Sequence, residues 1–498
     1  MKQRVTDNPA FAEQARNPTI RPWIFLATAA LYLAVGYFYT VRLRVVPLEA
    51  IVRTGIVFDL FQGTDLGRQG LVCSVLYPPL PTLFIALLGL LPMFLNQCFA
   101  AVVLSSLSAA GTVVLLDRVC EVFDTPRIAR VAAVVIFSGL PTTVLQGASG
   151  TSSSTLLVCS LALILCALQW ERTRQVRYLL GCGLLCAILP LISWQGLTAG
   201  VTGLLAIVLA VRLYVFAAEE RRGLYWALAF PPLFALAAMT GLNWVIMQDP
   251  LFAFRPLWAT TTWRHVLALA LAHHRILLPL LAGAALLTAL LRKQLFLPAV
   301  VIAALAGCTV ACNSDSVLPD VANNSASFLI PALGIIIGCW LASSPATDIR
   351  WRRVLSAVAI ALALFAGVLP GRPWHTSTGP YSPPVELCVK DDMARLRARV
   401  DSVAPQGKIL ADGFYDYALW YYGVGQGRLI RTLDFSSSTL LGLRMPVHLV
   451  SPKPVGRFSL EDVQIKLAGP HREGRPAFNY YLFHLADAGR WQIYRIMD

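Results

Sequence analysis

The sequence predicts a polytopic α-helical membrane protein with a small C-terminal α/β extracytoplasmic domain. Of its 498 residues, 57% are hydrophobic and only 14% are charged, whereas soluble domains carry about 25% charged residues. Apolar runs of about 20 residues, long enough to span a bilayer, recur along the first three quarters of the chain. Beyond residue 370 they stop, and short polar and apolar stretches typical of a small mixed domain replace them.

About eleven apolar runs are long enough to cross a membrane: 23–41, 98–117, 129–147, 152–170, 177–193, 195–216, 225–246, 267–291, 295–312, 325–343 and 354–370. A further run, 79–95, is shorter, contains Pro92 and leads into the polar pair Asn96-Gln97. We therefore expect about 11–13 transmembrane helices, with 79–95 re-entering from the outer face or lying against the bundle there.

The chain carries 41 Lys and Arg against 27 Asp and Glu. Such an excess can indicate nucleic acid, but here the basic residues cluster between apolar runs, as in the cytoplasmic loops of membrane proteins. We therefore expect no nucleic-acid partner and place the basic loops in the cytoplasm: 118–128, 171–176, 217–224, 292–294 and 344–353.

This orientation also places the polar N-terminal segment 1–22 in the cytoplasm, where it precedes an uncleaved signal anchor. The loop 42–78 and the C-terminus then lie outside. The alternative is twelve crossings with the N-terminus outside, if 79–95 spans fully. Most of the 11 cysteines fall within apolar runs and indicate neither a disulfide framework nor a zinc site.

The predicted transmembrane domain covers 23–370. The segment 371–386 contains four prolines and is predicted to be a linker. The domain 387–498 should contain a polar helix at 390–400, whose apolar stripe is Met393, Leu396 and Val400. An aromatic cluster at 414–422 and five short strands are also expected, at 408–411, 429–430, 447–450, 480–483 and 491–496.

The first outer loop, 42–78, is too polar to span a bilayer and carries three acids, Glu49, Asp59 and Asp65. Residues 48–61 have the pattern of an amphipathic interfacial helix, on which Glu49 and Arg53 form an i,i+4 pair. Two interpretations of Glu49 stay open at this point: a solvated residue of that helix, or the acid of a reaction centre facing the later helices.

Three short passages occur in a fixed order: Glu49-Ala50-Ile51-Val52-Arg53, then Tyr77-Pro78-Pro79-Leu80-Pro81, then Asn243-Trp244 followed by Asp249-Pro250-Leu251. This order resembles the GT-C superfamily of membrane glycosyltransferases, and most of all its bacterial mannosyl- and arabinosyltransferase-like members. In those members an Asp-Ala-x-x-Arg pattern precedes a Trp-x-Pro-Leu-Pro-type re-entry. The resemblance covers about residues 20–330.

The resemblance implies a glycosyltransferase, a hexosyl or pentosyl transferase, at the outer face of a bacterial inner membrane. It would move a sugar from a polyprenyl-phosphate donor to a lipid, glycan or protein acceptor. Glu49 would be the general base or a ligand of a divalent cation, Mg²⁺ or Mn²⁺, with Asp59 as the reserve catalytic acid. The expected donor-phosphate contacts are Arg53, Arg68 and Arg255; the other expected substrate-binding residues are Asp65, Tyr77, Gln146, Asn243 and Asp249.

The sequence departs from these relatives at several points. Glu49 replaces an Asp, Gly150–Ser154 lacks the acid of the second outer loop, and Ser193-Trp194-Gln195 stands where an Arg-Tyr-Glu-like passage is found. The alternative is therefore a catalytically degenerate GT-C-like membrane subunit or lipid-binding protein. A transporter is less favoured because it explains neither the acidic loop nor the outer domain.

Overall fold

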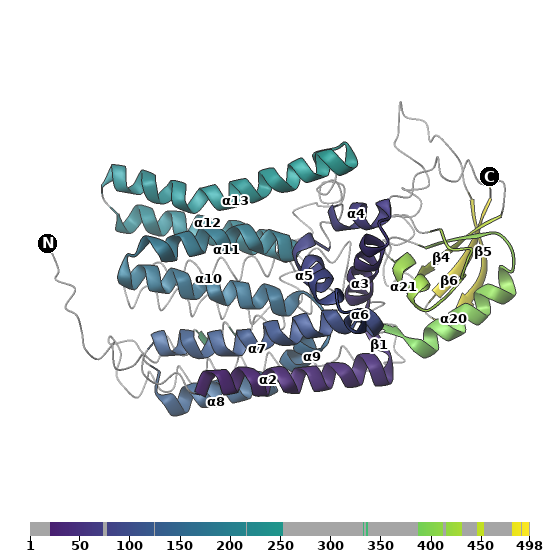
Figure 1. Ribbon diagram of the computed structural model, residues 1–498, viewed down its shortest axis with the longest axis horizontal. Helices are drawn as coiled ribbons and strands as arrows, with labels where there is room; N and C mark the ends of the chain where they lie inside the picture. Colours follow the sequence, from purple (N-terminus) through teal and green to yellow (C-terminus); the bar gives the residue numbers. More distant parts are fainter. Residues whose placement is uncertain are drawn as a thin grey trace.

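A computed structural model describes residues 20–72, 77–123, 125–215, 217–251, 332, 335–336, 387–411, 415–430, 446–452, 481–489 and 491–497. Within this part the chain is a helical membrane protein with a small sheet at its C-terminal end (Figure 1). The expected spans 267–291, 295–312 and 354–370, most of 325–343, and the linker 371–386 lie outside the described residues.

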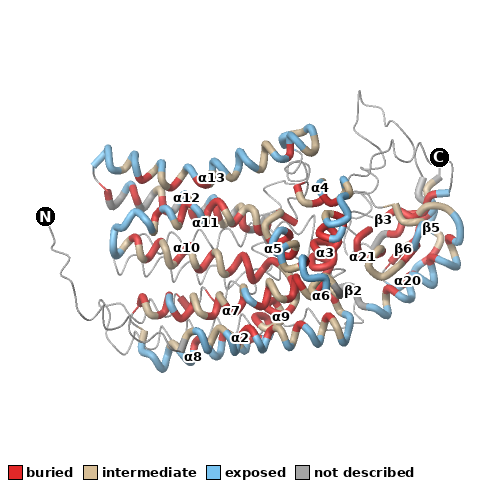
Figure 2. Tube along the Cα trace, viewed as in Figure 1, coloured by how far each residue is buried: buried red, intermediate tan, exposed pale blue. Residues whose placement is uncertain are grey.

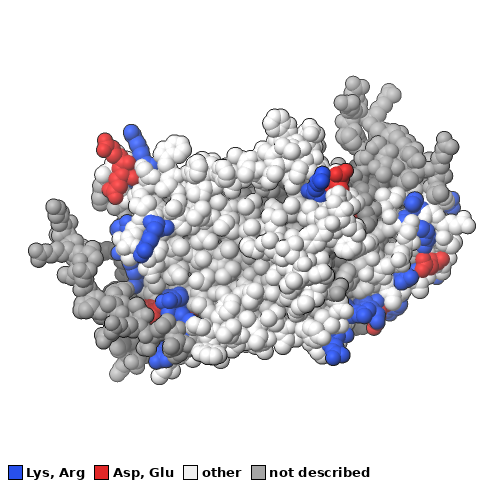
Figure 3. Space-filling model, viewed as in Figure 1, with Lys and Arg blue, Asp and Glu red and all other residues white. Residues whose placement is uncertain are grey.

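The long helices of the bundle lie side by side (Figure 1): α2 (Ile20–Tyr37, continued by the π-helix Phe38–Leu43), α7 (Phe99–Val122), α8 (Arg127–Gly139), α9 (Pro141–Ala148), α10 (Ser153–Thr173), α11 (Val176–Ile192), α12 (Trp194–Tyr214) and α13 (Ala218–Met247). Among the described residues, four helical stretches are each long and apolar enough to cross a membrane: Arg21–Leu43, α7, α10 and α13. Charged side chains gather at the two ends, and a broad uncharged belt separates them (Figure 3). Such a belt is what a bilayer requires.

The basic loops 118–128, 171–176 and 217–224 lie at the same end of the bundle as the start of α2 (Figure 1). The first loop and the C-terminal strands lie at the opposite end. The described helices therefore alternate as the basic loops require, while the side of the membrane on which each end lies stays a prediction.

The expected span 129–147 consists of two helices, α8 and α9, that together are long and apolar enough to span but are bent by 61°. The break falls at Leu140, whose backbone is extended (φ −60°, ψ 134°), immediately before Pro141 at the start of α9. A proline disfavours the helical conformation of the residue that precedes it, so the chain turns here.

Residues 79–98 fold as a short hairpin of α5 (Pro79–Gly89), α6 (Pro92–Leu95) and the 3₁₀ turn Asn96–Cys98. An eleven-residue helix is about 16 Å long, half of a bilayer core. The hairpin lies at the end of the bundle that holds the first loop (Figure 1), and α5 alone is too short to cross; the re-entry of 79–95 from the outer face stays a prediction. Its outward side chains are apolar and exposed, among them Leu83, Phe84, Leu87, Leu90 and Met93.

The C-terminal unit, as we call the described part after residue 386, consists of β2 (Leu387–Val389), α20 (Lys390–Val403), β3 (Lys408–Ala411), α21 (Tyr415–Tyr421), β4 (Val447–Pro452), β5 (Tyr481–Ala488) and β6 (Trp491–Met497). Its four-stranded sheet has the order β3-β4-β6-β5, in which only the β3–β4 pair is parallel. The stripe Met393, Leu396 and Val400 of α20 is buried as predicted. The expected strand 429–430 is wrong, because it makes only a single bridge to Ile409.

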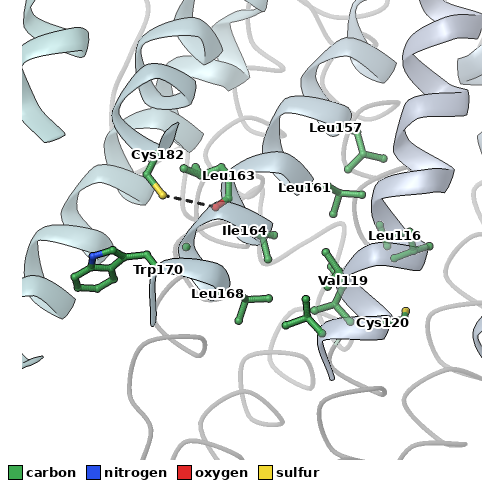
Figure 4. Packing of buried hydrophobic residues seen from close by; sticks show 14 of the residues in the cluster. Leu116, Val119, Cys120, Leu157, Leu161, Leu163, Ile164, Leu168, Trp170 and Cys182 are labelled. Carbon is green, nitrogen blue, oxygen red and sulfur yellow. Dashed lines mark hydrogen bonds between the residues drawn. The ribbon is translucent and has the colours of Figure 1, made fainter. Parts of the chain in front are cut away.

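The apolar interior divides into two clusters. The first lies inside the bundle, where α7, α10 and α11 contribute residues such as Leu116, Leu161 and Cys182 (Figure 4). The second, which we call the shared core, joins the first loop to the C-terminal unit. Its members include Val46, Ile51, Val52, Ile56, Leu396, Val400, Ile409, Tyr417, Val450 and Ile493.

The first loop is therefore built into the C-terminal unit. Its strand β1 (Val45–Pro47) pairs with β2 in an antiparallel register, Val46 opposite Cys388. The loop continues as α3 (Leu48–Phe61), which packs against α21, and as α4 (Asp65–Val72). The expected helix at 48–61 is confirmed with those bounds, but its polar face does not lie in water. All residues of α3 from Leu48 to Val57 are buried (Figure 2), because α3 packs against α4, α5 and α7 as well as against α21.

Candidate functional site

The candidate site is a buried salt bridge at the end of the bundle covered by the C-terminal unit. Arg53 Nε donates to Glu49 Oε1 at 2.8 Å, one helical turn apart on α3. The side chains of Arg53 and Glu49 are only 1% and 6% exposed. The interpretation of Glu49 as a solvated residue is therefore wrong. A charged pair removed from water in this way is costly unless further hydrogen bonds satisfy it.

Arg53 has those further bonds. Its Nη1 donates to the Pro78 carbonyl at 2.7 Å and to the Thr82 hydroxyl at 2.9 Å, and its Nη2 donates to the Ile192 carbonyl at 3.3 Å. The Tyr77 ring lies against the guanidinium, 5.7 Å from its centroid to Cζ. One side chain thus joins α3 to the hairpin and to the end of α11.

Glu49 Oε1 also accepts a hydrogen bond from the Ser152 amide at 3.1 Å, at the start of α10. A carboxylate at a helix N-terminus is favoured because the amides there have no partner within the helix. Both bonds end on Oε1, and Oε2 accepts none from the described part of the chain. Oε1 is therefore held in place, and Oε2 is the oxygen of Glu49 that the described residues do not engage.

The turn before α10 lies directly against this pair. Gly150 has a positive φ of +79°, and a Cβ built on it would stand 3.3 Å from the Cβ of Ala50. The Gly150 amide donates to Ser105 at 3.0 Å, and the Thr151 hydroxyl donates to Gln146 Oε1 at 3.1 Å. The predicted substrate-binding residue Gln146 thus lies near the pair, within a network of hydroxyl groups.

The other predicted acids of the first loop lie elsewhere. Asp59 is buried, but ten residues along α3 place it about 15 Å from Glu49 along the helix axis. Asp65 and Arg68 are exposed on α4 and approach each other to 3.8 Å. The two candidate catalytic acids are therefore not brought together as a pair.

Asn243 and Asp249 lie at the end of α13, which contacts α4. The Asn243 amide donates to the Met239 carbonyl at 3.0 Å, and its buried Oδ1 has no partner in the described structure. Asp249 Oδ1 accepts from the Leu251 amide at 3.1 Å. Arg255 lies outside the described residues.

The aromatic cluster contributes to packing rather than to an open platform. Tyr417 is buried in the shared core, and a Cβ at Gly55 on α3 would lie only 2.2 Å from its ring. Trp420 packs on Phe58 of the same helix, with ring centroids 5.2 Å apart. This glycine therefore lets α21 dock closely on α3, two residues beyond Arg53.

A divalent cation does not fit the described residues around Glu49. No group of three or more His, Cys, Asp or Glu that could hold a metal ion occurs in the part of the chain that the structure describes. The one carboxylate is already paired with a guanidinium, whose positive charge disfavours a cation beside it. We derive no step through a metal.

Three partners of the pair were not singled out in the sequence: Thr82, the Ser152 amide and the Ile192 carbonyl. Two of the three are main-chain groups, which leave no residue signature. Thr82, one residue after the Pro-Pro-Leu-Pro passage, is a polar side chain inside an apolar run. That is the only signal that could have identified it.

The chain matches no protein-family model, and no curated protein matches it.

Proposed function

We propose that the protein is a membrane glycosyltransferase that uses a polyprenyl-phosphate sugar donor at the end of the bundle where α3 lies. The observation that supports it is the Glu49 carboxylate, which is bonded through Oε1 and free of described partners at Oε2. The sequence resemblance indicates the class of reaction. The long apolar helices suit a membrane, which is where a lipid-linked donor would lie. In this proposal that end faces the outside of a bacterial inner membrane.

In the proposed reaction Glu49 Oε2 takes the proton of an acceptor hydroxyl as its oxygen attacks the sugar's anomeric carbon. The bond from that carbon to the donor phosphate oxygen breaks, and the lipid phosphate leaves with the bonding electrons. Inversion at the anomeric carbon follows from a single displacement. No cofactor is required by this balance.

Arg53 acts in this proposal as a positioning residue. Four hydrogen bonds to Glu49, Pro78, Thr82 and Ile192 already engage its guanidinium, so it orients the carboxylate rather than the donor phosphate. The phosphate contact then falls to Arg68, which is exposed at the same end, or to Arg255.

The test is transfer of radiolabelled sugar in membranes, with a panel of polyprenyl-phosphate donors. Glu49→Gln removes the charge and keeps the shape, so transfer should fall at least a hundredfold. The matched control is Glu219→Gln, the same change on the exposed first turn of α13 at the opposite end, which should leave transfer unchanged. Equal transfer by wild type and Glu49→Gln would remove Glu49 from the chemistry.

A loss of transfer has a structural explanation as well, because Glu49→Gln leaves a buried Arg53 without its charged partner. The double variant Glu49→Gln/Arg53→Gln removes both charges. If folding is restored while transfer stays absent, the carboxylate is needed for the reaction itself.

A second candidate function is a non-catalytic membrane subunit. The observation that favours it is the same salt bridge, in which nearly every donor of Arg53 and one oxygen of Glu49 serve to hold four segments together. A folded wild-type protein that transfers no sugar from any donor supports this candidate.

A further inference from the structure

At the end of the bundle opposite Glu49, the acids Asp117 and Glu121 form ion pairs within the protein. Arg21 Nε lies 2.8 Å from Asp117 Oδ2, and Arg130 Nη1 lies 3.1 Å from Glu121 Oε1. Asp117 and Glu121 lie near the end of α7, and the two arginines reach them from the start of α2 and from α8. These carboxylates are therefore unavailable to neutralise other arginines on the surface.

Several exposed arginines remain at the same row of helix ends, and three of them concern us here: Arg127 at the start of α8, Arg172 near the end of α10 and Arg177 at the start of α11. None of them makes an ion pair with a carboxylate in the described structure. Arg172 donates to the Val122 carbonyl at the end of α7, and Arg177 donates to the Tyr178 hydroxyl at 3.2 Å. α7 packs against α8 and α10, and α10 packs against α11, so these three side chains stand on neighbouring helices, which we call the arginine row. Separate patches of Lys and Arg lie at this end of the molecule, at the left of Figure 3.

Apolar side chains lie directly beside this row and face outward. Ile128 is 86% exposed, and Val131 and Val135 follow it on the same side of α8. On α11, Val176 and Leu180 are similarly exposed beside Arg177. A phospholipid can contact both features, because its anionic headgroup can bind the arginine at the helix end while its acyl chains lie along the apolar side of the helix. A soluble phosphate could contact only the arginine.

We propose that this arginine row, Arg127, Arg172 and Arg177, binds the phosphate headgroups of anionic phospholipids in the leaflet where this end of the bundle lies. The acyl chains lie along the apolar flanks of α8 and α11. The proposal does not depend on the glycosyltransferase assignment.

The experiment uses the full chain in lipid nanodiscs that contain phosphatidylcholine with about one third phosphatidylglycerol, and measures bound lipid by native mass spectrometry after mild extraction. Wild type should retain phosphatidylglycerol over phosphatidylcholine, and the triple variant Arg127→Gln/Arg172→Gln/Arg177→Gln should lower that ratio at least threefold. The matched control is Arg395→Gln/Arg397→Gln/Arg399→Gln, which removes three exposed arginines of α20 in the C-terminal unit and should leave the ratio unchanged.

Arg172 also contacts Val122, so the triple variant could lose stability. The double variant Arg127→Gln/Arg177→Gln keeps that contact and should still lower the ratio about twofold. An equal fall in both triple variants would overturn the proposal, since it would reflect net charge alone. No fall in either would overturn it as well. If inorganic phosphate at about 10 mM abolishes the preference for phosphatidylglycerol by competition, free phosphate rather than lipid occupies the row, and the proposal is overturned.

Discussion

The two ends of the helix bundle each hold arginine–carboxylate pairs, but only one of them is closed to water. At the end covered by the C-terminal unit, Arg53 and Glu49 are 1% and 6% exposed. At the other end, Asp117 is 9% exposed, but its partners Arg21 and Arg130 are 16% and 17% exposed, and Glu121 is 27% exposed. The local chemistry is the same, so the difference between the ends is one of environment.

That difference decides what each pair can do. A fully buried pair whose partner is removed leaves a charge that neither water nor protein stabilises, so Glu49 and Arg53 must be kept or lost together. The pairs at the open end are partly solvated and are expected to contribute about 1 kcal/mol or less each. In our proposals, the end at Glu49 (the closed end) holds a reactive carboxylate in a fixed position, and the end at Arg21 (the open end) contacts the membrane surface.

The largest expected effect is that of Arg53→Met. It leaves Glu49 without its charged partner and removes the bonds to Pro78, Thr82 and Ile192. The free energy of unfolding should fall by about 3–5 kcal/mol. Denaturant unfolding in detergent measures this. Adding Glu49→Gln to the same chain should recover part of the loss, and a loss under 1 kcal/mol for Arg53→Met would contradict the closed environment.

The second largest effect is expected for Gly55→Ala, which tests how closely α21 of the C-terminal unit packs on α3. The new Cβ would stand 2.2 Å from the Tyr417 ring, so α21 must move, at a cost of about 1–3 kcal/mol. Limited proteolysis should then release the C-terminal unit faster than in wild type. Gly241→Ala on α13, which meets nothing within 4 Å, is the matched control and should be neutral or slightly stabilising.

Arg21→Gln probes the open end. It removes the ion pairs with Asp117 and Glu121, and the free energy of unfolding should fall by about 1 kcal/mol, because these groups are partly solvated and Arg130 remains. The fall should shrink further in 1 M salt. An effect as large as that of Arg53→Met, and insensitive to salt, would abolish the distinction between the two ends.

The smallest expected effect is a pH dependence within the C-terminal unit. Burial, with the charges of Arg495 and Arg428, lowers the pKa of His448 from its ordinary value of about 6.5 despite a hydrogen bond to the Lys408 backbone. The unfolded chain then binds a proton more readily than the folded one. Stability from this residue is complete above about pH 6.5 and is lost as pH falls through the lower, folded-state pKa.

Replacing His448 with Gln should flatten that part of the stability profile, as measured by thermal unfolding between pH 4 and pH 8, roughly the range around the ordinary histidine value. A profile that keeps its slope in His448→Gln would assign the dependence to another group. The same profile with Arg53→Met should shift down as a whole without losing its slope.

The sequence by itself determined the class of protein and most helix positions, because apolar runs of bilayer length and the positions of prolines are local properties. It also correctly placed the buried stripe of α20 at Met393, Leu396 and Val400. These features depend on neighbours a few residues apart, so a single sequence contains them.

Only the tertiary structure decided the environment of the candidate site. The i,i+4 spacing of Glu49 and Arg53 was visible, yet whether water surrounds them depended on the hairpin and on the ends of α10 and α11, which lie 25 to 139 residues further along the chain. The partners of Arg53 include carbonyl groups of Pro78 and Ile192, and main-chain groups carry no residue code. Burial and main-chain hydrogen bonds arise from contacts between distant segments, which no local pattern records.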